Sequence, residues 1–151
     1  MLQGCTMSRI HSAVWRMSAV ATLALTASAP LYAEDEQTTV IDGRCQYPDR
    51  VAEYRNETTL ILCDTATITQ SATITTLDFS QRSWGSTARF TGNRTGDTIA
   101  ISTVALRGGS PVAARGSCEI FHRDDGRLSV ISCLVKAGSR SIAANFVPSR
   151  L

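Results

Sequence analysis

The chain has 151 residues, of which 43% are hydrophobic, and a formal net charge of +2 at pH 7. Arg9 and Arg16 account for this excess, so residues 34–151 carry 13 acidic and 13 basic side chains. A balanced charge provides no electrostatic footprint for nucleic acid or for an anionic membrane. We therefore expect no nucleic-acid partner.

Residues 1–33 have the pattern of a secretory signal peptide. A positively charged start precedes an apolar stretch over residues 17–27, and small residues then lead to a predicted cleavage site between Ala33 and Glu34. The stretch is shorter than the ~20 apolar residues that span a bilayer, so we expect no transmembrane segment in the mature chain. An uncleaved anchor is the alternative, and either Met1 or Met7 can be the start. The Ala-, Ser- and Thr-rich leader is typical of bacteria and predicts a periplasmic or secreted protein.

Cysteine usage agrees with export. Residues 34–151 contain four cysteines, namely Cys45, Cys63, Cys118 and Cys133. An even number in an oxidising compartment indicates a disulfide framework. No two of them have the close spacing of zinc ligands, and we expect neither a metal ion nor another cofactor.

Residues 34–151 are predicted to form one all-β domain. Residues 34–56 have an irregular pattern and are interpreted as an N-terminal strap, with a possible short helix at Pro48–Tyr54. Residues 57–148 alternate strand-like runs with turn signals, as in a β-meander. The expected strands, about seven in number, are 59–63, 72–79, 88–91, 98–106, 112–122, 128–135 and 141–147.

Short hairpin connections imply antiparallel neighbours, because parallel strands need long crossovers. A sheet of this size protects its edges by curling or by splitting into two layers. The prediction is a curled sheet or a small up-and-down barrel, with a β-sandwich as the second choice. Within 98–106 the apolar residues change face between Ile101 and Val104, which predicts a β-bulge near Ser102-Thr103 unless both faces are buried.

The strongest hairpin signal is Asp125-Gly126. If these two residues form the centre of the turn, antiparallel pairing places Cys118 directly opposite Cys133, within the span of a disulfide. By elimination Cys45 pairs with Cys63, which ties the strap to the first strand.

Few residues offer catalytic chemistry. His122 is the only histidine beyond the leader, so a Ser-His-acid triad would have to use it beside Asp124-Asp125, two acids that the turn already explains. Asp78 and Glu119 are the acids within expected strands, where solvation or an Arg partner accounts for them. The sequence therefore assigns no catalytic residue and disfavours an enzyme.

Candidate binding residues are Arg82, Trp84 and Arg89, which lie in or near the predicted loop at 81–85. An exposed aromatic side chain beside Arg can anchor a partner. The alternative is that Trp84 folds back to plug one end of a barrel, since large aromatic side chains are usually buried.

The favoured function is a non-enzymatic binding or inhibitor module that contacts a protein or glycan of the cell envelope. A small-ligand carrier with an apolar barrel interior is the alternative, and an enzyme is least favoured. The segment Ser86-Thr87-Ala88-Arg89-Phe90 resembles the serine-bearing segment of bacterial lysozyme inhibitors, which are also small exported β-barrels. The resemblance covers these five residues, and the family's lysine-containing motif has no counterpart, so no function is transferred from it.

Overall fold

A computed structural model describes residues 36–149. The predicted signal peptide and its cleavage site lie outside the described residues. Within the described range, no helix combines the length and apolar character that crossing a membrane requires.

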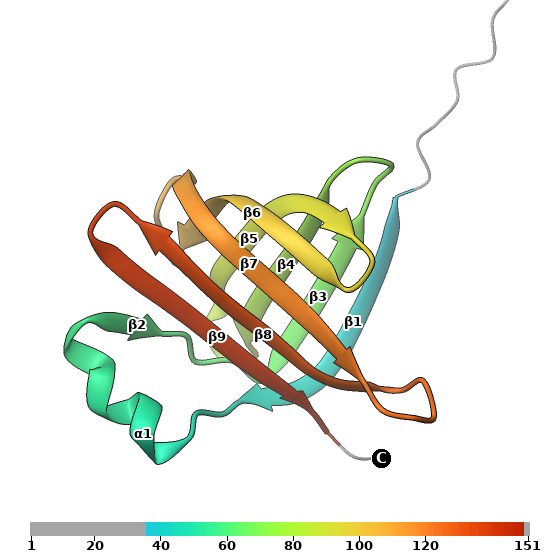
Figure 1. Cartoon of the computed structure of the whole chain (residues 1–151), viewed down its shortest axis with the longest axis horizontal. Coiled ribbons are helices and arrows are strands. Elements are labelled where there is room, and N and C mark those ends of the chain that lie inside the picture. The colour runs from blue at the N-terminus through green and yellow to red at the C-terminus, as the bar shows by residue number, and fades with distance from the viewer. Residues whose placement is uncertain (1–35, 150–151) are drawn as a thin grey trace, which may run out of the picture. The chain divides into compact units, whose positions relative to one another are not determined.

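Eight antiparallel strands close into a barrel, and a ninth short strand lies outside the closed ring (Figure 1). The barrel strands are β1 (Gln37–Cys45), β3 (Thr65–Gln70), β4 (Thr75–Gln81), β5 (Gly85–Thr95), β6 (Thr98–Leu106), β7 (Val112–His122), β8 (Leu128–Ala137) and β9 (Arg140–Pro148). Between β1 and β3 lie a short helix α1 (Asp49–Ala52), a 3-10 turn η1 (Glu53–Asn56) and the extra strand β2 (Thr58–Leu60). The predicted all-β barrel and the short helix near Pro48 are confirmed.

The N-terminal segment corrects the prediction, because residues 37–45 form a full barrel strand and not an irregular strap. β1 pairs with β3 along one edge, where Thr39 lies opposite Ile68, and with the end of β9, where Cys45 lies opposite Phe146. β1 has little local strand signal because most of its side chains are exposed. It forms a strand because β3 and β9 offer it two open edges, and closure removes both edges from solvent.

The predicted strand at 59–63 is also corrected. Its first part belongs to β2, which pairs in parallel with the start of β9 and takes no place in the meander. The first strand after the connection is instead β3 at Thr65–Gln70, which the sequence prediction omitted. β2 pairs with residues 141–143 of β9, and β1 pairs with residues 146–148. The free edge of β9 is therefore hydrogen-bonded by β2 near its start and by β1 near its end.

Side chains fill the barrel interior. Phe79, Phe90 and Phe146 are fully buried, with ring centroids 5.7 Å apart for Phe79 and Phe90 and 6.3 Å apart for Phe79 and Phe146. Branched aliphatic residues from every barrel strand except β5 pack around them or around their neighbours. An eight-stranded barrel is just wide enough for side chains to fill it in this way.

The predicted bulge lies where expected. Thr91 pairs with Thr103 and Gly92 pairs with Ile101, so Ser102 is the extra residue on β6. The bulge turns Ile101 and Val104 both inward, which explains the change of face in the sequence.

The β7–β8 hairpin confirms the disulfide but corrects the turn. The loop has three residues, because Arg123 and Arg127 pair across it and Gly126 adopts a positive φ of 77°. A compensating register shift follows between His122 and Phe121. Cys118 therefore still faces Cys133. The second predicted bridge, Cys45–Cys63, is present as well.

Candidate binding surface

One end of the barrel is covered by the segment Ile61–Asp64, here called the crossing segment, which runs from β2 to β3. Ile61 and Cys63 are buried, with exposed fractions of 4% and 6%, whereas Leu62 between them is 58% exposed. Backbone hydrogen bonds attach the segment to β1: Cys45 N–H donates to Cys63 O at 2.9 Å and Gly43 N–H to Asp64 O at 3.0 Å. The Cys45–Cys63 disulfide also ties the crossing segment to β1. The covered end is therefore rigid and presents Leu62 outward.

Trp84 stands at this closed end, in the β4–β5 turn, and is 58% exposed. The guanidinium carbon of Arg107, from the β6–β7 turn, lies 5.0 Å from the centre of its ring, in a cation–π contact. The alternative that Trp84 plugs the barrel is wrong, since Ile61 and Cys63 occupy that place. The indole is instead presented to solvent with one neighbour fixing its orientation.

Contacts connect Trp84 to the crossing segment through Thr87. The Thr87 hydroxyl donates to Leu62 O at 2.9 Å, and Arg107 N–H donates to Thr87 O at 3.0 Å. Thr87 thus links the backbone of the crossing segment to the turn that carries Arg107, whose guanidinium contacts Trp84. Leu62, Arg107 and Trp84 therefore come from three separate connections at one end of the barrel.

Arg82 lies in the same turn as Trp84 but faces different neighbours. Its guanidinium is 2.9 Å from the Asp42 carboxylate, and its backbone N–H lies 3.1 Å from both carboxylate oxygens of Asp64. The hydrogen bond and the charge of Asp42 raise the pKa of Arg82 above its usual value. Arg82 therefore anchors the turn to β1 and the crossing segment.

Arg89 lies on the outer face of β5, apart from the turn. It contacts Asp78 of β4 through Nη2 at 2.8 Å and Nε at 2.9 Å, and the Ser86 hydroxyl donates to the same carboxylate at 3.0 Å. Its charge is thus neutralised by a local partner. The structure places Arg82 and Trp84 together in one turn but does not bring Arg89 to them.

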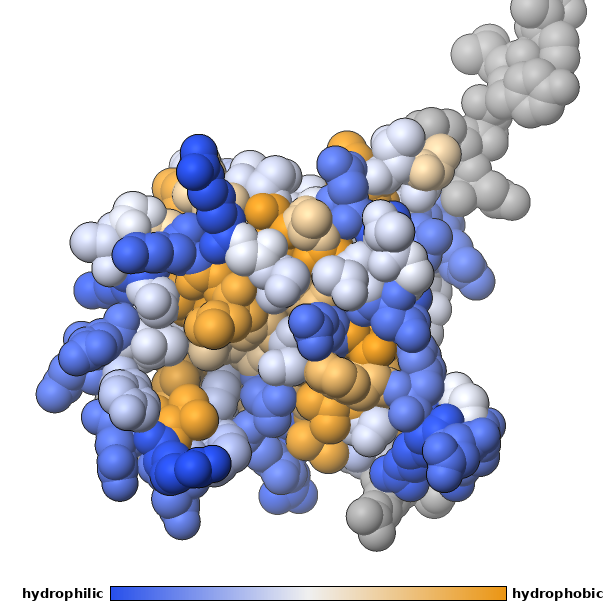
Figure 2. All heavy atoms as spheres, in the orientation of Figure 1, coloured by the Kyte–Doolittle hydropathy of each residue, from blue (hydrophilic) through white to orange (hydrophobic). Residues whose placement is uncertain are grey.

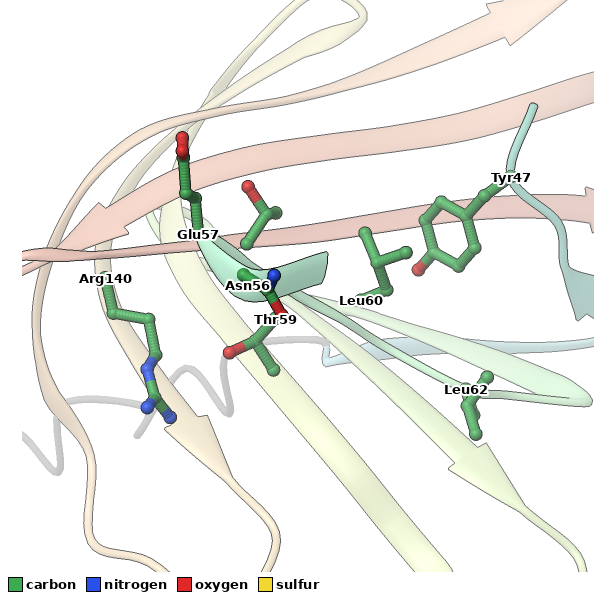
Figure 3. A pocket seen from close by; sticks show the side chains of 8 residues that line it. Tyr47, Asn56, Glu57, Thr59, Leu60, Leu62 and Arg140 are labelled. Carbon is green, nitrogen blue, oxygen red and sulfur yellow. The ribbon is translucent and has the colours of Figure 1, made fainter. Parts of the chain in front are cut away.

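A groove of about 480 Å³ continues the closed end along β2 (Figure 3). Arg140 lies at one end of the groove, and Tyr47 and Leu62 lie at the other. The Tyr47 hydroxyl shares its hydrogen between Ile61 O at 2.6 Å and Ala143 O at 2.9 Å, and burial raises the pKa of Tyr47 to about 12. The groove therefore joins an apolar part, next to Leu62, to a part that carries two opposite charges, those of Glu57 and Arg140.

Sequence reasoning missed Leu62, Arg107 and Tyr47. Leu62 sits in a continuous apolar run, and alternation alone marks it as facing away from Ile61 and Cys63. Arg107 is distant from Trp84 in sequence, and only strand pairing brings the two turns together. His122, the candidate catalytic histidine, lies 3.6 Å from Asp97 of the β5–β6 turn, at the opposite end of the barrel from Trp84.

No family model, no curated protein and no solved structure matches this chain. The fold and the surface define a class: a disulfide-bonded, eight-stranded antiparallel barrel with a filled interior and an exposed aromatic surface at its closed end.

Proposed function

We propose that this protein is an exported, non-enzymatic binding module that engages a partner protein through the closed end of its barrel. The observation that carries the proposal is Trp84, a large aromatic side chain that is 58% exposed yet oriented by Arg107. Burying such a side chain in an interface removes apolar area from water at little cost in side-chain ordering.

The composition of the surface favours a protein over a glycan. Trp, Tyr and Arg are the residue types that dominate binding energy at protein interfaces. Leu62 adds an exposed aliphatic side chain at the same end of the barrel, and an aliphatic side chain contributes more to a protein contact than to a polar sugar. Arg107 also occupies one face of the indole, which leaves a single ring face for stacking.

The filled interior speaks against the carrier alternative, because three phenylalanine rings occupy the volume that a ligand would need.

Export is the second part of the proposal. Two disulfides support an oxidising compartment, periplasmic or extracellular. Expression of the full chain followed by N-terminal sequencing tests it: a start at Glu34 supports export with cleavage, and an intact N-terminus in the cytoplasm contradicts it.

Binding is tested by affinity capture from an envelope extract with the exported protein as bait, in wild-type, Trp84→Ala and Ile74→Ala forms. Ile74 is the matched control because it is an exposed apolar residue in the β3–β4 turn at the opposite end of the barrel. A partner protein captured by wild type and Ile74→Ala is then purified and titrated directly. We expect Trp84→Ala to weaken its binding by about tenfold or more.

An equal affinity for the Trp84→Ala and wild-type proteins would contradict the proposal. A soluble envelope oligosaccharide that quenches the fluorescence of Trp84 in place of any protein would replace the partner class with a glycan. Lysozyme should be included among the purified proteins that are tested. Inhibition of lysozyme activity by wild type that is lost in Trp84→Ala would support the proposal.

A further inference from the structure

Two cations face each other directly on the outer surface of the barrel. Arg115 of β7 and Lys136 of β8 are opposed positions in the ladder, and both residues are exposed. Like charges at directly opposed positions destabilise an antiparallel pair. The arrangement therefore carries a cost in the absence of an anion.

The immediate surroundings do not neutralise this pair. On its other side Lys136 lies opposite Ser141 of β9, and within residues 36–149 no carboxylate is within salt-bridge distance of either cation. Elsewhere on the same barrel, Arg82, Arg89 and Arg127 each have an acidic partner at 2.9 Å or less. Other arginines within residues 36–149 also have no carboxylate at salt-bridge distance, among them Arg107, Arg123 and Arg140. What distinguishes Arg115 and Lys136 is that the two cations stand directly opposite each other in one ladder.

A hollow of about 570 Å³ adjoins the two cations. It forms where β6 and β7 lose register, because the pairing passes from Ile101–Gly116 to Thr103–Ala113 and leaves Ser102, Ala114 and Arg115 without ladder partners on that edge. Gly116 permits the irregularity: its φ is +149°, and a Cβ there would collide with Leu134 O. Apart from the two cations, the hollow is lined by uncharged residues, namely Ile101, Ser102, Ala113, Ala114 and Gly138.

We propose that this hollow binds a phosphate-type oxyanion between Arg115 and Lys136. The planar guanidinium of Arg115 offers two parallel donors to such an anion, and the Lys136 ammonium adds a compact charge. A negative charge between them replaces repulsion with two charge-assisted hydrogen bonds. The site lies between β6, β7 and β8 and does not use Trp84, so it goes beyond the proposed partner surface.

The phosphate can belong to a free ion or to a lipid headgroup. Leu134 lies two residues from Lys136 on the same face of β8 and is 62% exposed. Figure 2 shows hydrophobic side chains next to hydrophilic ones on the β7–β9 side of the molecule. The test therefore uses two ligands. Inorganic phosphate is compared with chloride at equal ionic strength, and vesicles of phosphatidylglycerol are compared with vesicles of phosphatidylcholine.

The experiment measures the melting temperature and the affinity of the exported protein in titrations with inorganic phosphate. We expect phosphate to raise the melting temperature more than chloride does, and Arg115→Gln and Lys136→Gln each to weaken phosphate binding by about tenfold. Without phosphate, Lys136→Gln should melt higher than wild type, because it removes the repulsion. Arg123→Gln, an exposed arginine in the β7–β8 turn, is the matched control and should bind phosphate as wild type does.

An equal response of wild type, Arg115→Gln and Lys136→Gln to phosphate would overturn the proposal, as would an equal response of wild type to phosphate and chloride. Binding to phosphatidylglycerol vesicles that both variants lose, with inorganic phosphate competing, would assign the site to a lipid headgroup. Trp84→Ala should leave phosphate binding unchanged, so the two proposals fail independently.

Discussion

Cys118 and Cys133 occupy directly opposed positions on β7 and β8, with Cα atoms 4.0 Å apart and both side chains in the barrel interior. The bridge closes a separation of 15 residues around the hairpin turn. Cross-linking positions that already face each other restrains the unfolded chain without requiring the native strands to move.

The first prediction concerns this bridge. The Cys118→Ala/Cys133→Ala double variant should lower the free energy of unfolding by about 3 kcal/mol, measured by urea denaturation. The corresponding Cys45→Ala/Cys63→Ala variant should lose a similar amount, because its separation of 18 residues is comparable. Four free thiols in denatured, unreduced protein comprising residues 34–151 would contradict both bridges.

The second prediction separates stability from binding with two adjacent residues of the crossing segment. Ile61→Ala should lower the free energy of unfolding by about 2–5 kcal/mol, because Ile61 packs into the core and its removal leaves a cavity. Leu62→Ala should change it by less than about 0.5 kcal/mol, since Leu62 faces solvent. Leu62→Ala should nevertheless weaken binding of the captured partner. Equal destabilisation by the two variants would show that the segment does not alternate between core and solvent.

The third prediction tests the close approach of β5 and β6. A Cβ on Gly92 would collide with the backbone carbonyl of Ala100, and a backbone atom in a ladder cannot move aside cheaply. Gly92→Ala should lower the free energy of unfolding by about 1–3 kcal/mol or more. Gly109→Ala is the control, since its Cβ would lie 3.3 Å from its nearest neighbour, Leu106 O, in an exposed turn. If Gly109→Ala lowered the free energy of unfolding as much as Gly92→Ala does, this explanation would be refuted.

The fourth prediction is a pH dependence. Burial raises the pKa of Tyr47 to about 12 from the usual tyrosine value of 10.0, so folding favours the neutral hydroxyl. The stability that this contributes is fully present below pH 10 and is lost as the pH rises toward 12. Above that range the phenolate has no hydrogen to share between Ile61 O and Ala143 O.

Ultraviolet absorbance of tyrosinate during an alkaline titration should show this late ionisation in wild type and not in Tyr47→Phe. The free energy of unfolding of wild type should fall more steeply between pH 10 and 12 than that of Tyr47→Phe. Parallel pH profiles would mean that Tyr47 ionises alike in the folded and unfolded chains.

Local pattern determined much of this barrel before any tertiary information. The expected ranges 98–106 and 112–122 coincide with β6 and β7, because both strands alternate apolar and polar residues between clear turn signals. The bulge at Ser102 was also predictable, since the spacing of apolar residues in β6 changes face there. Both disulfides were predictable from the positions of the four cysteines relative to the predicted strands and turns.

The candidate surface was predictable only in part. The sequence points to Trp84 because it is an aromatic residue in a predicted loop, with Arg82 and Arg89 as further candidates in or near that loop. Pairing with Asp78 removed Arg89 from that surface, while strand order brought in Arg107. Sequence distance is a poor guide here, because adjacent turns at one end of a barrel are separated by two whole strands.

The composition and spacing of the chain by themselves determined an all-β, disulfide-linked domain with most of its hairpins in register. Tertiary structure alone decided that residues 37–45 are a barrel strand, that β2 leaves the meander, and that Leu62 and Trp84 face solvent at the closed end. The physical reason is closure: β1 and β2 obtain their hydrogen-bond partners from the edges of β3 and β9, which exist only once the other strands have assembled.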